Sequence, residues 1–167
     1  MVIRALRSRR GYTLVEILIT IAIMGVLAMF GPTLMTQITK FFVLSRAKLD
    51  LQQQARAAMY IITRELRQAQ SNTITVDEVS GQPYYSRIKF TKVQGAVITI
   101  NQSNNQLILT EGTDTSVLSK NLAYLAFTFP RSDDMTMISV SLTLEEQIYG
   151  GLLKALNMAS EQVEVMN

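Results

Sequence analysis

The stretch that decides the fold is Arg9-Arg10-Gly11-Tyr12-Thr13-Leu14-Val15-Glu16, which opens a long apolar run ending at Phe30. From Leu14 to Phe30 the only charged residue is Glu16, and the others are apolar residues, one glycine and one threonine. A helix needs about 20 mainly apolar residues to cross a bilayer, with about 17 as the lower limit. The segment from Tyr12 to Phe30 is therefore expected to be a membrane-spanning helix.

Glu16 is the unusual residue of this segment. An ionised carboxylate at membrane depth costs several kcal/mol, and such residues are rare and usually paired. We therefore expect Glu16 to meet a positively charged partner when the protein works.

Four arginines precede the apolar run: Arg4, Arg7, Arg9 and Arg10. By the positive-inside rule they predict an N-terminus in the cytoplasm. A secretory signal peptide has a similar basic start. This run, however, is long for a signal peptide, contains Glu16 and lacks a small-residue cleavage site at its end. The chain also has no cysteine, which excludes a lipoprotein signal. We expect a retained, single-pass anchor.

The sequence Arg10-Gly11-Tyr12-Thr13-Leu14-Val15-Glu16 resembles the class III signal of type IV pilins and pseudopilins. In that family a membrane-embedded prepilin peptidase cuts after the glycine, and the new N-terminal residue is N-methylated. The resemblance implies cleavage between Gly11 and Tyr12 and methylation of Tyr12. Tyr12 stands where the family usually has phenylalanine.

The same resemblance implies a role for Glu16 in assembly, as a registration device that attracts the ammonium group of Tyr12 on a neighbouring subunit. Two unit charges 4 Å apart gain about 4 kcal/mol at an effective dielectric constant near 20, before desolvation is subtracted. The implied partners are other pilins or pseudopilins in a filament or tip complex, the prepilin peptidase and an inner-membrane assembly platform.

Gly25, Gly31 and Pro32 lie in or just after the apolar run. Proline removes a backbone donor and clashes with the preceding turn, so a kink or local melting is expected near Gly31 and Pro32. In pilins this region is often melted in the assembled filament. The alternative stays open that glycine and proline are simply more frequent in transmembrane helices.

The remaining chain predicts an α+β fold, with one long helix laid against an antiparallel sheet of about four to six strands. An apolar stripe at three- and four-residue steps predicts that the helix continues over residues 32–70: Leu51, Ala55, Ala58, Met59, Ile62, Leu66 and Ala69. Alternating or turn-bounded segments predict strands at 86–93, 96–100, 106–110, 122–129, 135–144 and 162–166. Residues 145–157 are ambiguous, because Gly150-Gly151 interrupts a possible short helix.

These boundaries divide the chain into a leader (1–11), a transmembrane or filament-core helix (12–31), the second half of the long helix (32–70) and a periplasmic β domain (71–167). Residues 52–69 resemble the corresponding helix of W-type minor pilins and J-type minor pseudopilins. The late strands and the final residues, 163–167, are also similar to those relatives.

The charge balance argues against a dedicated nucleic-acid-binding surface. The chain has 16 basic and 13 acidic residues, but 12 basic residues remain once the four leader arginines are removed. The basic character thus belongs to the leader. The chain has no histidine and no cysteine, which removes the commonest general base and the thiolate ligands. Asp133 and Asp134 resemble a solvated turn more than a cation site. We predict no enzyme activity and no cofactor.

Three functions are compatible with this sequence. The first is a minor pilin or minor pseudopilin that helps to initiate or cap a type IV pilus or a type II secretion pseudopilus. The second is a major pilin. The third, from another class, is a membrane-anchored periplasmic binding protein that never polymerises.

Overall fold

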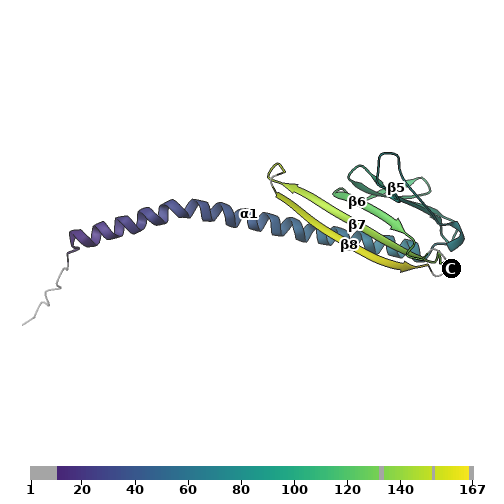
Figure 1. Ribbon diagram of the computed structural model, residues 1–167, viewed down its shortest axis with the longest axis horizontal. Helices are drawn as coiled ribbons and strands as arrows, with labels where there is room; N and C mark the ends of the chain where they lie inside the picture. Colours follow the sequence, from purple (N-terminus) through teal and green to yellow (C-terminus); the bar gives the residue numbers. More distant parts are fainter. Residues whose placement is uncertain (1–10, 132–133, 152, 166–167) are drawn as a thin grey trace, which may run out of the picture. The chain divides into compact units, whose positions relative to one another are not determined.

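A computed structural model describes residues 11–131, 134–151 and 153–165 of the 167-residue chain (Figure 1). One long helix, α1 (Leu14–Arg67), is followed by a short 3-10 turn, η1 (Ser71–Thr73). Eight strands follow: β1 (Thr75–Asp77), β2 (Arg87–Thr91), β3 (Val97–Ser103), β4 (Gln106–Glu111), β5 (Asp114–Ser119), β6 (Leu122–Thr128), β7 (Met137–Ile148) and β8 (Leu153–Glu164). The α+β class and the packing of a helix on antiparallel strands are confirmed.

The chain divides into two compact units, residues 1–42 and 43–167, which are described separately. In the first unit, every described residue except the half-buried Gly31 is exposed. Its most apolar 18-residue window has a mean hydropathy of 2.4 and is 0% buried. This part of α1 is thus long and apolar enough to cross a membrane, and its apolar surface needs a cover from outside the described chain.

Several threonine hydroxyls in this first unit donate hydrogen bonds to backbone carbonyl groups of the helix itself. Thr20 Oγ1 donates to Glu16 O at 2.6 Å, and Thr39 Oγ1 donates to Met35 O at 2.9 Å. Such local hydrogen bonds let a polar side chain reside in an apolar environment. The helix continues without interruption through Pro32. Melting near Gly31 and Pro32 on assembly stays a prediction.

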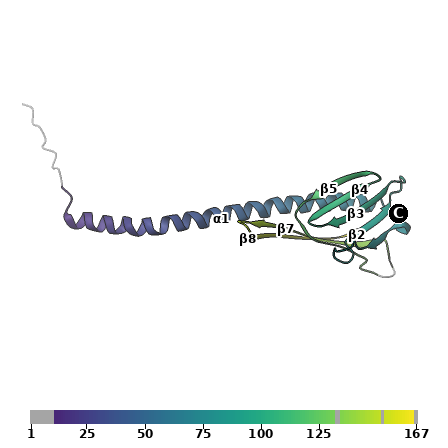
Figure 2. The same cartoon turned by 90° about the horizontal axis from the view of Figure 1, so that it is seen from above.

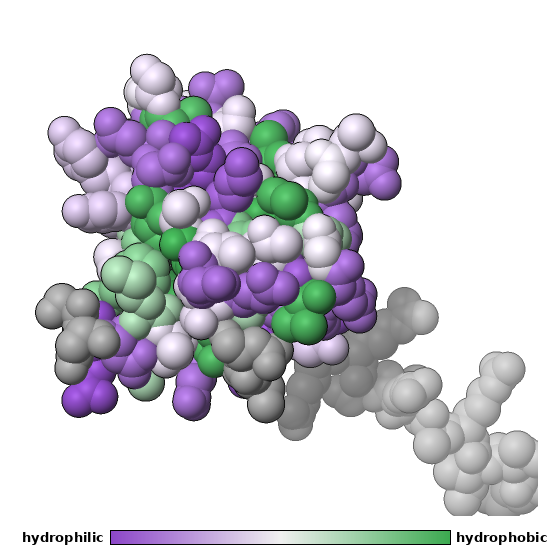
Figure 3. Space-filling model, turned by 90° about the vertical axis from the view of Figure 1, so that its right-hand side faces the viewer, coloured by the Kyte–Doolittle hydropathy of each residue, from purple (hydrophilic) through white to green (hydrophobic). Residues whose placement is uncertain are grey.

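The second unit is built around the apolar stripe of α1, and all seven predicted stripe residues are buried. Against them pack alternate residues of the strands, including Ile98 and Ile100 in β3 and Val140 and Leu142 in β7, each at most 1% exposed. This alternation is the period-two pattern of strands with one buried face. Figure 3 shows hydrophilic and hydrophobic residues intermixed on one end of this unit, as expected for a water-facing surface.

The strands form two antiparallel sheets along the C-terminal part of α1 (Figures 1 and 2). One sheet has the order β1-β2-β3-β4-β5, and the other has the order β6-β7-β8. The predicted hairpin around Asn101–Asn105 is confirmed as β3–β4, in which Ser103 pairs with Gln106. Asn104 occupies the turn with φ of 52°, a conformation that asparagine tolerates better than most residues.

One sequence expectation was wrong, and the structure decides one segment that the sequence left ambiguous. The single sheet of four to six strands is instead two sheets, and the short strands β1 and β5 were not predicted. Residues 145–151 and 153–157 form no short helix; they belong to the β7–β8 hairpin. The turn contains Tyr149, Gly150 and Gly151, whose φ angles of 54°, 67° and 92° are incompatible with a right-handed helix.

A backbone hydrogen bond and an ion pair join the C-terminal end of α1 to the residues directly after β2. Val93 N donates to Gln68 O at 3.0 Å, and Lys92 Nζ lies 2.5 Å from Glu65 Oε2. Lys92 Nζ also lies 2.9 Å from Glu111 Oε1 of β4. Burial acts to lower the pKa of Lys92, but the Glu65 and Glu111 carboxylates outweigh it and raise that pKa above its ordinary value.

We predict that Lys92→Met destabilises the second unit by about 3 kcal/mol, because it leaves the buried Glu65 carboxylate without its cation. The double variant Glu65→Leu/Lys92→Met removes both charges and should recover most of the loss. Urea unfolding of the full chain in detergent, monitored by near-ultraviolet circular dichroism, measures the free energy of unfolding of both variants. Equal instability of the single and double variants would contradict this role of the ion pair.

The raised pKa of Lys92 also predicts a pH dependence of stability. A raised pKa contributes stability that is complete below the unfolded value, near 10.5, and is lost as the pH rises through the folded value. The unfolding temperature of wild type should therefore fall more steeply at strongly alkaline pH than that of Lys92→Met. Parallel pH profiles of the two proteins would contradict this linkage.

Candidate processing and assembly site

The predicted cleavage position lies in non-helical chain directly before α1. Residues 11–13 have no assigned secondary structure, and Tyr12 is 80% exposed. A Cβ placed on Gly11 would meet no atom within 4 Å, so nothing in the described chain shields this bond. The geometry leaves the peptide bond between Gly11 and Tyr12 open to a peptidase.

Thr13 explains why the helix begins where it does. Its Oγ1 accepts a hydrogen bond from Glu16 N at 3.3 Å, and its carbonyl oxygen accepts one from Ile17 N at 3.2 Å. Thr13-Leu14-Val15-Glu16 thus has the Thr-x-x-Glu spacing of a capping box, and a carboxylate in the first turn is favoured by the helix dipole. The Thr13 hydroxyl thus caps α1 through the backbone N–H of Glu16.

The cation that Glu16 was expected to meet is absent from the described part of the chain. None of the ion pairs among residues 11–131, 134–151 and 153–165 includes Glu16. Arg9 and Arg10 lie outside the described residues. Within what the structure describes, Glu16 is exposed, and so are its neighbours in the apolar N-terminal part of α1. A partner for it has to come from another group or another molecule.

Gly25 and Gly31 are not required for packing inside this chain. A Cβ added at either position would meet nothing within 4 Å, and both residues lie in regular helix. The reason for glycine at these positions is therefore a close approach by another molecule, a need for backbone freedom, or the composition bias of membrane helices. The predicted kink or melting function of Gly25, Gly31 and Pro32 stays a prediction.

The predicted turn at Asp133 and Asp134 is only partly described, because Asp133 lies outside the described residues. Asp134 Oδ1 accepts hydrogen bonds from the backbone N–H and the hydroxyl of Thr136, which lower the pKa of this carboxyl below its usual value. Among the described residues no group of three potential metal ligands is found. The carboxylate thus serves the turn that leads into β7.

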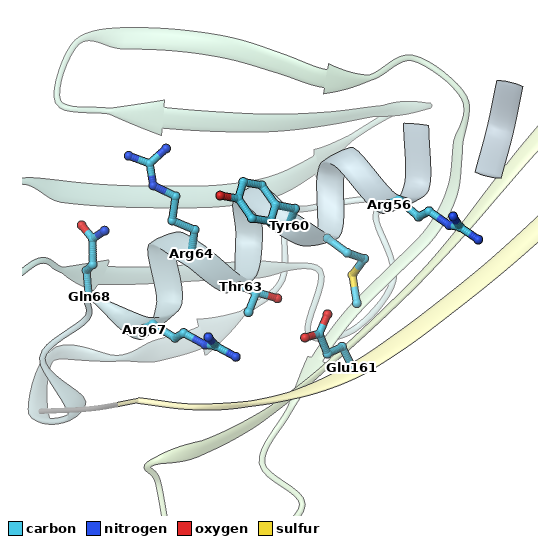
Figure 4. Close-up of a pocket in the computed structure, with 8 residues that line it drawn as sticks. Arg56, Tyr60, Thr63, Arg64, Arg67, Gln68 and Glu161 are labelled. Carbon is cyan, nitrogen blue, oxygen red and sulfur yellow. The ribbon is translucent and has the colours of Figure 1, made fainter. Parts of the chain in front are cut away.

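A concave surface that sequence reasoning missed lies between α1 and β8. It is a groove of about 600 Å³ whose lining includes Arg56, Arg64, Arg67 and Glu161 (Figure 4). The sequence pattern gave no sign that a strand from the end of the chain lies beside this part of the helix.

Comparison with known families finds one match, to the family described as a prokaryotic N-terminal methylation motif, over residues 6–31. Comparisons with curated proteins and with solved structures found no match. The matched range contains the exposed Gly11–Tyr12 bond, the Thr13 cap, Glu16 and the apolar half of α1. Residues 6–31 therefore carry the prokaryotic N-terminal methylation motif, a type IV pilin-type prepilin cleavage signal.

Proposed function

We propose that this protein is a minor pilin or minor pseudopilin that helps to initiate or cap a type IV pilus or a type II secretion pseudopilus. The observation that carries the proposal is the methylation motif on the N-terminal part of α1, where residues 14–42 are exposed except for the half-buried Gly31. Such a surface is stable only in a membrane or against other apolar helices. The likeness of residues 52–69 to W-type and J-type subunits favours a minor over a major subunit.

The proposed sequence of events begins in the inner membrane, with the N-terminus in the cytoplasm and the β domain in the periplasm. Prepilin peptidase hydrolyses the Gly11–Tyr12 bond, which releases the basic leader and leaves an α-amine on Tyr12. Methylation of that amine keeps its positive charge. The amine then pairs with Glu16 of a neighbouring subunit while the assembly platform moves the helix out of the lipid.

Cleavage is the first test. Co-expression of the full chain with a prepilin peptidase should yield a protein that starts at N-methylated Tyr12, as read by N-terminal mass spectrometry. Gly11→Leu should stay uncut, because the peptidase no longer finds the small residue before the bond. Gly25→Leu is the matched control and should be cut normally, since it lies away from the cleaved bond and a Cβ at this position meets no atom within 4 Å. A wild-type chain that stays intact would favour a non-polymerising anchored protein.

The charge of Glu16 is tested separately from its capping role. Gln retains the capacity for a capping box but has no charge. We therefore expect Glu16→Gln and Glu16→Ala to be cleaved normally and to enter sheared filaments about tenfold less than wild type, which corresponds to about 1.4 kcal/mol. Quantitative immunoblots of the filament fraction measure this. Normal incorporation of Glu16→Gln would show that assembly does not need the charge of Glu16.

A further inference from the structure

The exposed apolar surface of α1 continues well beyond the apolar run that ends at Phe30. Five large apolar side chains after Pro32 are each 49–69% exposed: Leu34, Met35, Ile38, Phe41 and Phe42. Phe41 and Phe42 form an edge-to-face pair whose ring centroids lie 6.2 Å apart. Large exposed apolar surfaces mark contacts with a membrane or with another protein. This part of the helix is therefore expected to have a contact outside the described chain.

The polar residues of the same segment are compatible with lipid. Thr36 Oγ1 donates to Thr33 O at 2.8 Å, and Thr39 Oγ1 makes the same kind of bond to the helix backbone. These two hydroxyls therefore need no water. Lys40 is exposed, and none of the ion pairs in the described part of the chain includes it. A lysine at a membrane boundary lays its methylene groups along the lipid and places its ammonium group among the headgroups.

The exposed segment has the length of a whole bilayer. The helix rises about 41 Å from Leu14 to Phe41 at about 1.5 Å per residue, and a bilayer with its headgroup layers is about 40–45 Å thick. The hydrocarbon core alone, about 30 Å, takes about 20 helical residues. A core over residues 17–36 puts Tyr12 in one headgroup layer, where tyrosine is enriched, and Phe41 in the other.

Two positions of the membrane along α1 differ in the surroundings of Glu16. If the hydrocarbon core covers residues 12–31, the Glu16 backbone lies about 6 Å inside it. If the core covers residues 17–36, Glu16 lies at its boundary. Helical side chains lean toward the N-terminus of their helix. In the second position the Glu16 carboxylate therefore leans out of the hydrocarbon, where its charge costs little.

The aromatic pair favours the same position. With a core over residues 12–31, Phe41 starts about 15 Å beyond the hydrocarbon and is exposed to water. With a core over residues 17–36, it starts about 7.5 Å beyond, and its ring leans back toward the lipid because the N-terminus lies on that side. The cores are otherwise nearly balanced, because two large aliphatic residues leave at one end and two large apolar residues enter at the other.

We propose that the hydrocarbon core of the membrane covers residues 17–36 of α1, and that Lys40, Phe41 and Phe42 anchor the helix in the headgroup layer that follows, with the Lys40 ammonium group bound to lipid phosphate. We call these three residues the headgroup anchor. The anchor goes beyond the proposed function, because it requires only that α1 is inserted in a membrane. The same position explains how Glu16 is tolerated before assembly, since its carboxylate reaches the aqueous boundary.

Tryptophan fluorescence tests the position of the membrane. The chain contains no tryptophan, so one introduced tryptophan reports its own depth. The full chain is placed in phosphatidylethanolamine–phosphatidylglycerol vesicles whose lipids carry bromine, a quencher, either near the headgroup or near the bilayer centre. Val26→Trp and Ile21→Trp replace exposed side chains, so neither change disturbs packing.

The two variants distinguish the two positions, because residue 26 is central in a 17–36 core and residue 21 is central in a 12–31 core. We expect the deep quencher to act about twofold more strongly on Val26→Trp, which lies about 7.5 Å nearer the centre than Ile21→Trp. Equal quenching of the two variants, or the reverse order, would overturn the proposal.

Phe42→Trp tests the anchor itself. It should be quenched by bromine near the headgroup and should emit at a shorter wavelength than Tyr60→Trp, an exposed aromatic position further along the helix. Adding Lys40→Glu should reduce this quenching about twofold, because lipid phosphates repel the new carboxylate. Lys48→Glu, about 12 Å further along, is the matched control and should change nothing. An unquenched Phe42→Trp, or quenching that Lys40→Glu leaves unchanged, contradicts the anchor.

A second copy of the chain is the other occupant to distinguish. Lipid quenching of Phe42→Trp should be the same at high and low ratios of protein to lipid, whereas quenching that appears only on dilution would mean that copies cover this side chain instead of lipid. The assay uses no peptidase, so it separates the two proposals. An uncut chain with a 17–36 core keeps the anchor and loses the proposed function, and a cleaved chain with a 12–31 core does the opposite.

Discussion

Helix α1 has to satisfy two different surroundings, and the rest of the structure depends on that constraint. From Ala47 to Leu66 one face of the helix is buried by two sheets, whereas residues 14–43 present apolar side chains that the described chain leaves uncovered. Burying apolar surface contributes about 25 cal/mol per Å². The folded domain therefore stabilises only one half of the helix, and the other half is stable in a membrane or a bundle of like helices. The proposed function rests on the exposed apolar side chains of this uncovered half.

The covered half is held in register by charge as well as by packing. Apolar residues alone would tolerate small rotations of a helix on a sheet, since hydrophobic attraction has no preferred direction. The Lys92 ammonium between Glu65 of the helix and Glu111 of β4 admits one arrangement at low cost, because the buried charges of Lys92 and Glu65 need each other. The position of the helix end also fixes which side chains, Arg67 among them, point toward β8 (Figure 4).

Local pattern was sufficient for much of this molecule. The stripe through Leu51 and Ile62 predicted the buried face of the helix, and the Gly11-to-Glu16 stretch predicted the motif that the family comparison found. The β7–β8 hairpin was missed because residues 152–157 are rich in good helix formers, and pairing along all of β7 overrides that preference. The division into two sheets and the groove between α1 and β8 depend on which elements are neighbours, and the local sequence pattern does not show that.

In the proposed filament, the helix dipole acts in opposite ways on the two charges at the N-terminus, the Glu16 carboxylate and the Tyr12 ammonium group. Glu16 sits in the first turn of α1, where the positive end of the helix dipole stabilises a carboxylate. The ammonium group created at Tyr12 lies at the same end, where the dipole opposes it. Each helix thus prefers its own carboxylate and disfavours its own amine. A neighbouring subunit displaced along the axis relieves the amine with its Glu16 carboxylate, so the dipole favours a pair between two chains over two isolated charges. Cleavage therefore does more than remove the leader arginines, because it creates the charge that requires a neighbour.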